Sequence, residues 1–129
     1  MKKQKVIVIT GASSGIGKVT AEYLYKTGNT VYGLSRSKGD SEGINYLATD
    51  ITKKEEIDFA FKSIYNDHGR IDVIINNAGL GVSGAIEYAT DEDYHRIFDL
   101  NIKGMINVTQ IAIPYLRESQ GRIINIGSV

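Results

Sequence analysis

The chain has 129 residues, of which 42% are hydrophobic, and its 15 basic side chains balance its 15 acidic ones. Zero cysteines exclude a disulfide framework, a thiolate metal site and a thiol nucleophile. The zero net charge argues against binding to nucleic acid, because such binding depends on neutralising many phosphates. We therefore expect a single domain over residues 1–129 with its own core and no metal site.

The amino terminus is rich in lysine, and only four apolar residues, Val6 to Ile9, follow it. This run is too short for the core of a secretion signal or for a membrane span. We expect a cytoplasmic protein that does not associate with membranes.

Five short apolar segments predict the strands of a parallel sheet. Residues 6–9, 31–34, 71–75 and 123–126 are continuous runs rich in β-branched side chains, which is typical of strands covered on both faces. Residues 44–48 alternate between apolar and polar side chains, which predicts an edge strand.

Helical periodicity follows the first, third and fourth of these segments in chain order. Residues 16–24 predict a helix that ends at Gly28, and residues 57–68 predict one that ends at Gly69 and opens with a capping box over Thr52–Glu55. A long helix is expected from about 91 to 116, with Thr90 as its N-cap and Pro114 bending its last turn. Strands that alternate with helices indicate a doubly wound α/β sheet with right-handed crossovers.

A glycine-rich turn, TGASSGIG over residues 10–17, lies between the first strand and the first helix. We expect positive φ at Gly11, close approach of a pyrophosphate to bare backbone at Gly15, and tight packing of helix on strand at Gly17. The start of the helix would offer free N–H groups and the positive end of its dipole to the phosphates. A tight connection without any ligand is the alternative interpretation of this turn.

Further motifs follow the other strands: Asp50, NNAG at residues 76–79, Asn101 with Gly104 in the long helix, and Gly127–Ser128. Together with the glycine-rich turn, these make five motifs in order, and on them the whole chain resembles the short-chain dehydrogenase/reductase family. The resemblance implies a Rossmann-like sheet in the order 3-2-1-4-5, binding of NAD or NADP, and hydride transfer between a hydroxyl and a carbonyl group of a small molecule. The residues of the turn that it assigns to the cofactor are Thr10, Gly11, Ser13, Ser14, Gly15, Ile16 and Gly17.

The end of the second strand indicates which cofactor is bound. Ser35 stands where an NAD enzyme is expected to place an acid on the adenosine ribose, and Arg36 follows it. An arginine can form a bidentate contact with a 2′-phosphate, so we favour NADP over NAD. An exposed arginine at the end of a strand, without a ligand, is the alternative.

Two other segments are expected to contact the adenosine. The Asp50 carboxylate could accept from the adenine amino group while the Ile51 amide donates to the ring, although Asp50 could equally help to cap the next helix. The resemblance also places Asn77, Ala78 and Gly79 near the adenosine ribose. The side-chain amides of the same motif are expected to tie neighbouring strands together.

Two residues are candidates for catalysis. Asn101 falls on the predicted buried stripe of the long helix, together with Tyr94, Ile97, Phe98, Met105, Val108 and Ala112. It is either a satisfied core amide or, by resemblance, part of a proton relay beneath the nicotinamide at a bent helix turn. By resemblance, Ser128 would hold the substrate oxygen.

The family also uses a tyrosine with a lysine four residues later, and no tyrosine within residues 1–129 has a lysine at that spacing. Because members of the family are longer and add strands beside the fifth, we expect this chain to be the cofactor-binding half and to be inactive alone. The alternative is a non-catalytic dinucleotide-binding module that associates with another chain.

A second apolar stripe on the long helix, Ile102, Ile106, Thr109 and Ile113, is expected to face away from the sheet. The fifth strand should form an unpaired apolar edge, with one sheet face partly bare beside it. We therefore expect a homo-oligomer that forms through helix 91–116 and the open sheet edge.

Overall fold

The computed structural model describes residues 4–79 and 86–127. In chain order the elements are β1 (Val6–Thr10), α1 (Gly15–Lys26), β2 (Thr30–Ser35), β3 (Asn45–Ala48), α2 (Lys54–His68), β4 (Val73–Asn76), the 3-10 turn η1 (Ile86–Tyr88), α3 (Asp91–Phe98), the π-helical segment η2 (Asp99–Gly104), α4 (Met105–Ser119) and β5 (Arg122–Asn125). The strands form one parallel sheet in the order β3-β2-β1-β4-β5, which confirms the predicted fold class and strand order.

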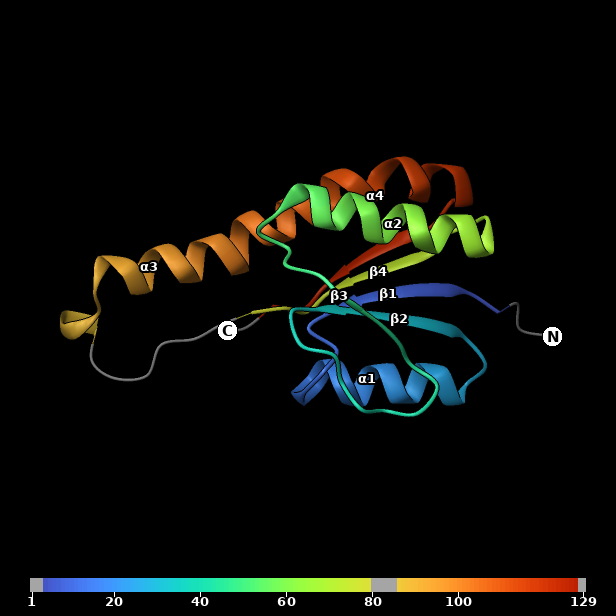
Figure 1. Cartoon of the computed structure of the whole chain (residues 1–129), viewed down its shortest axis with the longest axis horizontal. Helices are drawn as coiled ribbons and strands as arrows, with labels where there is room; N and C mark the ends of the chain where they lie inside the picture. The colour runs from blue at the N-terminus through green and yellow to red at the C-terminus, as the bar shows by residue number, and fades with distance from the viewer. Residues whose placement is uncertain (1–3, 80–85, 128–129) are drawn as a thin grey trace.

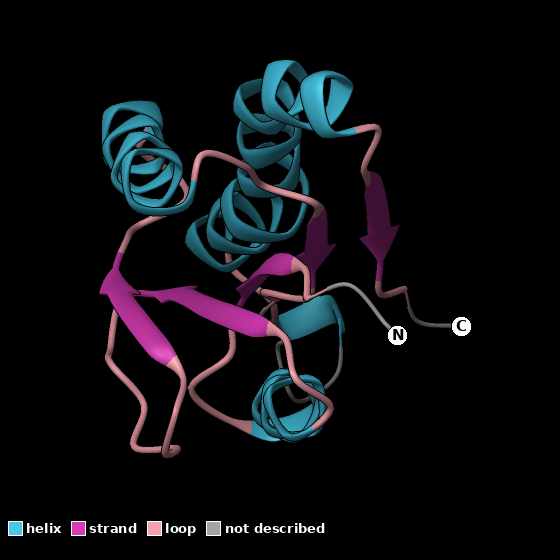
Figure 2. Ribbon diagram, turned by 90° about the vertical axis from the view of Figure 1, so that its right-hand side faces the viewer, coloured by secondary structure: helices cyan, strands magenta, loops and turns pink. Residues whose placement is uncertain are grey.

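Helices cover the sheet from both sides (Figures 1 and 2): α2 and α4 lie on one face and α1 on the other. Because side chains of a strand alternate between faces, β1 sends Val8 toward α2 and α4, and Ile7 and Ile9 toward α1. The larger cluster includes the fully buried Phe61 and Val108. Because all five strands run parallel, their carboxyl ends lie together at one end of the sheet.

The edge strand β5 is exposed along its length, as the sequence predicts. Ile123 and Ile124 are 36% and 40% exposed. On the face shared with α1, a cavity of about 650 Å³ opens between that helix and β5, and Ile7, Ile75 and Ile124 are among its lining residues. One sheet face is therefore covered beside β2 and open beside β5.

The long helix begins as predicted, because Thr90 and Asp93 form a capping box at the start of α3. It is not a uniform α-helix, since η2 interrupts it before α4 continues past Pro114 to Ser119. Val108 and Ala112 are buried as expected, but Tyr94 and Phe98 are 38% and 56% exposed. The predicted buried stripe is therefore wrong in its first half, because α3 extends beyond the sheet (Figure 1).

The start of α2 also differs from the prediction. The capping box over Thr52–Glu55 is absent: α2 begins at Lys54, and its N-cap, Lys53, makes no side-chain capping bond. The Thr52 hydroxyl instead donates to Oδ1 of Asp50 over 2.7 Å. A hydrogen bond to a charged carboxylate is stronger than the neutral hydrogen bond that the hydroxyl would form with a helix amide. The other end is as predicted, with Gly69 in the left-handed region at φ 70°.

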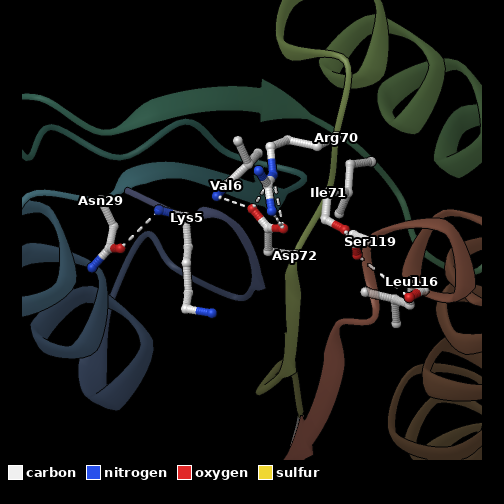
Figure 3. Close-up of polar contacts among 8 residues, drawn as sticks. All are labelled: Lys5, Val6, Asn29, Arg70, Ile71, Asp72, Leu116 and Ser119. Atoms are coloured by element: carbon white, nitrogen blue, oxygen red, sulfur yellow. Dashed lines mark hydrogen bonds and ion pairs between the residues drawn. The ribbon is translucent and has the colours of Figure 1, made fainter. Parts of the chain in front are cut away.

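Polar contacts fasten the amino ends of the strands (Figure 3), on the opposite side of the sheet from the carboxyl ends. The Asp72 carboxylate accepts from the Val6 amide over 2.8 Å and from Nε of Arg70 over 2.9 Å. Ser119, at the end of α4, donates its hydroxyl to the Ile71 carbonyl over 2.7 Å. These bonds fix where β1 and β4 begin and where α4 ends.

Candidate functional site

A cleft of about 280 Å³ lies at the carboxyl ends of β1, β2, β3 and β4. In a doubly wound sheet this is the edge at which ligands bind. Predicted site residues supply most of its lining, and three further lining residues, Leu34, Thr49 and Leu100, were not predicted from the sequence. The predicted residues that line it are Gly11, Ser14, Ser35, Arg36, Asp50, Ile51, Asn77, Ala78 and Gly79.

The three glycines of the turn differ in conformation and surroundings, and the predictions for Gly11 and Gly17 are confirmed. Gly11 has a φ of 70°, a conformation that favours glycine. A Cβ atom at Gly17 would collide with the Gly11 carbonyl and with the side-chain amide of Asn77, so only hydrogen fits there. Gly15 has a φ of 58°, and a Cβ atom there would meet open space. The backbone at Gly15 is therefore accessible from outside.

Side chains tie this turn to the segment after β4. The buried Thr10 hydroxyl oxygen accepts from the amides of Asn77 and Ala78, each over 3.0 Å. The Asn77 side chain donates back to the Gly11 carbonyl over 3.1 Å. Asn76 donates to Oδ1 of Asn125 over 2.9 Å, so the motif also joins β4 to β5, as predicted.

The amino end of α1 reaches the cleft through one residue. Ser14 is the N-cap, and its side chain makes no capping bond within the described structure. Ser14 therefore does not cap the amides of the first turn of α1. Ile16, which is 68% exposed, does not line the cleft. The other residues of the turn that were expected at the cofactor but do not line the cleft are Thr10, Ser13, Gly15 and Gly17.

At the end of β2, Ser35 and Arg36 line the cleft. The Ser35 hydroxyl donates to the Ser37 carbonyl over 2.5 Å, so it holds the loop that follows. The hydrogen bond from the Thr52 hydroxyl is the main cause that lowers the pKa of Asp50, and the charge of Arg36 lowers it further. Asp50 is therefore ionised at neutral pH, and it holds Thr52 while it lines the cleft. The capping of α2 considered for Asp50 is not found, because Asp50 binds the amide and hydroxyl of Thr52, ahead of the helix.

The long helix holds Ile51 from behind. A Cβ atom at Gly104 would lie 2.8 Å from Cδ1 of Ile51, which shows how closely the helix approaches. Asn107 is 2% exposed and donates its side-chain amide to the Ile51 carbonyl over 3.2 Å. The sequence analysis missed Asn107, although an amide three residues after Gly104 lies on the same helical face and could have indicated it.

Asn101 lies in η2 and is partly buried, so it is not at the centre of a fully buried face. A Cβ atom at Gly79 would be 3.5 Å from Oδ1 of Asn101. Asn101 therefore lies next to the segment that follows β4, beside the cleft. The other candidate for catalysis, Ser128, lies outside the described residues.

Comparisons with known proteins agree with this geometry. The family described as short chain dehydrogenase matches residues 5–129. The chain belongs to this family. A 3-ketodihydrosphingosine reductase of Bacteroides thetaiotaomicron is 42% identical over 127 residues, which are 97% of this chain and 47% of that protein. The chain thus spans about half the length of the curated relatives that it matches.

Solved structures share the fold, among them a short chain dehydrogenase and a protein called ElxO. The dehydrogenase, from Leptospira borgpetersenii with bound NAD+, has a TM-score of 0.89 and 29% identity, over 98% of this chain and 52% of that one. ElxO with NADP bound has a TM-score of 0.87 and 27% identity, over 98% of this chain and 56% of that one. Similar structures thus hold either nicotinamide dinucleotide, and the likeness alone does not choose between them.

Among the described residues of this short chain dehydrogenase, no helix combines the length and the apolar character that crossing a membrane requires. The cytoplasmic location stays a prediction.

Proposed function

We propose that this chain forms the NADP-binding part of an oxidoreductase that interconverts a carbonyl and an alcohol group of a small molecule. The main observation in favour of NADP is that Arg36 lines the cleft, while its neighbour Ser35 stands where an NAD enzyme is expected to have an acid. A carboxylate there would repel a 2′-phosphate, whereas a guanidinium can bind two of its oxygens.

The turn after β1 fits the pyrophosphate of a dinucleotide. Gly15 presents backbone with no described side chain in the way, and α1 begins beside it with amides that its N-cap, Ser14, does not cap. Such a helix start attracts anions through its N–H groups and its dipole. Thr10, Gly11 and Gly17 keep the turn in this shape, and Ser13 and Ile16 would contribute through their backbone.

The opposite side of the cleft fits the adenosine. The Asp50 carboxylate and the Ile51 amide would hold the adenine ring, and Asn107 fixes the Ile51 peptide from behind. Asn77, Ala78 and Gly79 would lie along the ribose, because the bonds to Thr10 bring their backbone to the cleft.

The bound nicotinamide would supply the hydride. Among the residues of this chain, Asn101 would hold a water molecule of the proton relay beside Gly79, and Ser128 would donate a hydrogen bond to the substrate oxygen. Charge that develops on that oxygen is stabilised by such a donor.

The choice of cofactor is tested by the variant Arg36→Ala, with titration of NADPH and NADH by calorimetry. We expect the dissociation constant for NADPH to rise about tenfold or more, because a charge-assisted contact is lost, and that for NADH to change less than about twofold. Arg117→Ala, on the exposed side of α4, is the matched control. Equal losses for both cofactors would overturn the NADP assignment.

We also propose that the chain forms a homo-oligomer. Phe98, Ile102 and Ile106 are 56%, 44% and 45% exposed, and they recur every four residues along the long helix. An apolar row of this kind favours a partner helix, and the exposed β5 edge offers unpaired backbone groups.

A further inference from the structure

The loop between β2 and β3 is held against α1 by polar side chains. Nζ of Lys18 lies 3.2 Å from Oδ1 of Asp40, and the Ser41 hydroxyl donates to the Glu22 carboxylate over 2.8 Å. Ser14, Lys18 and Glu22 are spaced four apart, so they share one face of α1. That face therefore runs from the cleft, at Ser14, along the loop that begins at Arg36.

Lys18 and Asp40 are both close in the chain to residues that line the cleft. Lys18 follows Ser14 by four residues and Asp40 follows Arg36 by four, and both Ser14 and Arg36 line the cleft. Four residues of α-helix advance only about 6 Å, which is comparable to the length of a lysine side chain. Long side chains on a helix also lean toward its amino end. An extended Lys18 side chain thus spans the distance to Ser14, which lines the same cleft as Arg36.

The ion pair itself is weak enough to exchange. The side chains of Lys18 and Asp40 are 37% and 88% exposed, and water and salt screen such a pair. A phosphate monoester carries up to two negative charges and three acceptor oxygens, which makes it a stronger partner for an ammonium group than one exposed carboxylate.

We propose that Lys18 is a second cation for the 2′-phosphate of the cofactor, beside Arg36, and that Asp40 competes with this phosphate for its ammonium group. The inference rests on the proposed NADP preference. It makes Lys18 a specificity-determining residue and Asp40 a carboxylate that limits the affinity for NADP.

A purely structural role for this ion pair predicts a different result. If the pair only held the loop in place, the loss of either partner would loosen Arg36 and weaken phosphate binding. If Lys18 binds the phosphate, the loss of Lys18 weakens binding and the loss of Asp40 strengthens it. The signs of the two changes therefore distinguish the two roles.

The experiment uses two probes that contain only the adenosine end of the cofactor, adenosine 2′,5′-bisphosphate and 5′-AMP, titrated by calorimetry at low salt. For Lys18→Met we expect about tenfold weaker binding of the bisphosphate and less than about a twofold change for 5′-AMP. For Asp40→Asn we expect about threefold tighter binding of the bisphosphate, because a competing charge is removed. Lys26→Met, at the far end of α1, is the matched control and should change neither value.

The outcomes separate this inference from the proposed function. If the unmodified protein prefers the bisphosphate, loses this preference in Arg36→Ala and keeps it in Lys18→Met, the inference fails and the NADP assignment stands. Weaker binding in both Lys18→Met and Asp40→Asn also overturns the inference, in favour of the structural role. If the unmodified protein binds both probes equally, the NADP assignment fails first.

Discussion

The buried carboxylate of Asp72 accepts a hydrogen bond from the backbone amide of Val6 over 2.8 Å and thereby joins the start of β4 to the start of β1. Burial alone would raise the pKa of this carboxyl group. The hydrogen bonds from Arg70 and Val6 and the charges of Arg70 and Lys5 outweigh burial and hold the pKa below its ordinary value. The ionised form is therefore the one that the fold stabilises.

Replacing this carboxylate should cost stability and change the response to acid. Because the pKa is lower in the folded chain than in the unfolded one, the stabilisation is present above the unfolded pKa of about 4 and is lost as the pH falls through the folded value. We expect Asp72→Asn to lower the free energy of unfolding at pH 7 by about 1–3 kcal/mol and to flatten its decline below about pH 4. Urea titrations followed by circular dichroism at several pH values measure both effects.

Asp58→Asn is the matched control, since Asp58 forms an exposed ion pair with Lys62 and should change the free energy of unfolding by less than about 1 kcal/mol. An equally steep acid decline in Asp72→Asn and in the unmodified chain would contradict the role given to Asp72.

A methyl group at Gly17 should separate the glycine turn from the segment after β4. It would collide with the Gly11 carbonyl and the Asn77 side-chain amide, which are themselves hydrogen-bonded. We expect Gly17→Ala to lower the free energy of unfolding by about 1–3 kcal/mol and to weaken dinucleotide binding. Thermal unfolding and cofactor titration measure these effects. Gly127→Ala, where a Cβ atom meets no described residue, is the control, and equal losses in both variants would refute the packing argument.

Charges on the exposed apolar row of the long helix should reduce self-association. We expect the double variant Phe98→Glu and Ile106→Glu to sediment as a smaller species than the unmodified chain, because an interface cannot bury unpaired carboxylates cheaply. Phe59→Glu, which replaces a 74% exposed side chain on α2, should leave the mass unchanged. Identical masses for all three proteins would count against an oligomer that forms through this helix.

The polypeptide of residues 1–129 should not reduce carbonyl compounds with NADPH. It contains no tyrosine followed by a lysine four positions later, so the proton donor of the family's reaction is missing from it. Consumption of NADPH by the pure polypeptide, followed by absorbance with a panel of small ketones, tests this. Clear turnover would show that another side chain supplies the proton.

The sheet could be predicted because its cause is local. Continuous β-branched runs form buried strands, and glycines such as Gly69 end helices wherever a left-handed residue is needed. The start of α2 could not be predicted in the same way. Thr52 has two possible acceptors within a few residues, and the choice of Asp50 depends on how the chain leaves β3.

The cleft shows a similar division between local and distant causes. Glycine motifs mark positions where no side chain fits, and amide motifs mark side chains that bind neighbouring backbone. Gly17 and Asn77 could therefore be found from their patterns. Asn107 belongs to no such motif, so only its spacing from Gly104 on one helical face indicated it, and its partner, the Ile51 carbonyl, could not be predicted from that spacing. Leu34 and Leu100 were missed since apolar side chains at a cleft look like ordinary core residues.

The π-helical segment between α3 and α4 sets how far α3 is rotated about the helix axis relative to α4. A π turn spans about one residue more than an α turn, and each residue of an α-helix rotates by about 100°. If the same six residues 99–104 were wound as α-helix, the face that carries Tyr94 and Phe98 would therefore be rotated by roughly a quarter of a circle relative to Val108 and Ala112. The orientation of an entire helical face thus depends on the π winding of a six-residue segment, of which Leu100 lines the cleft and Asn101 and Gly104 pack against residues that line it.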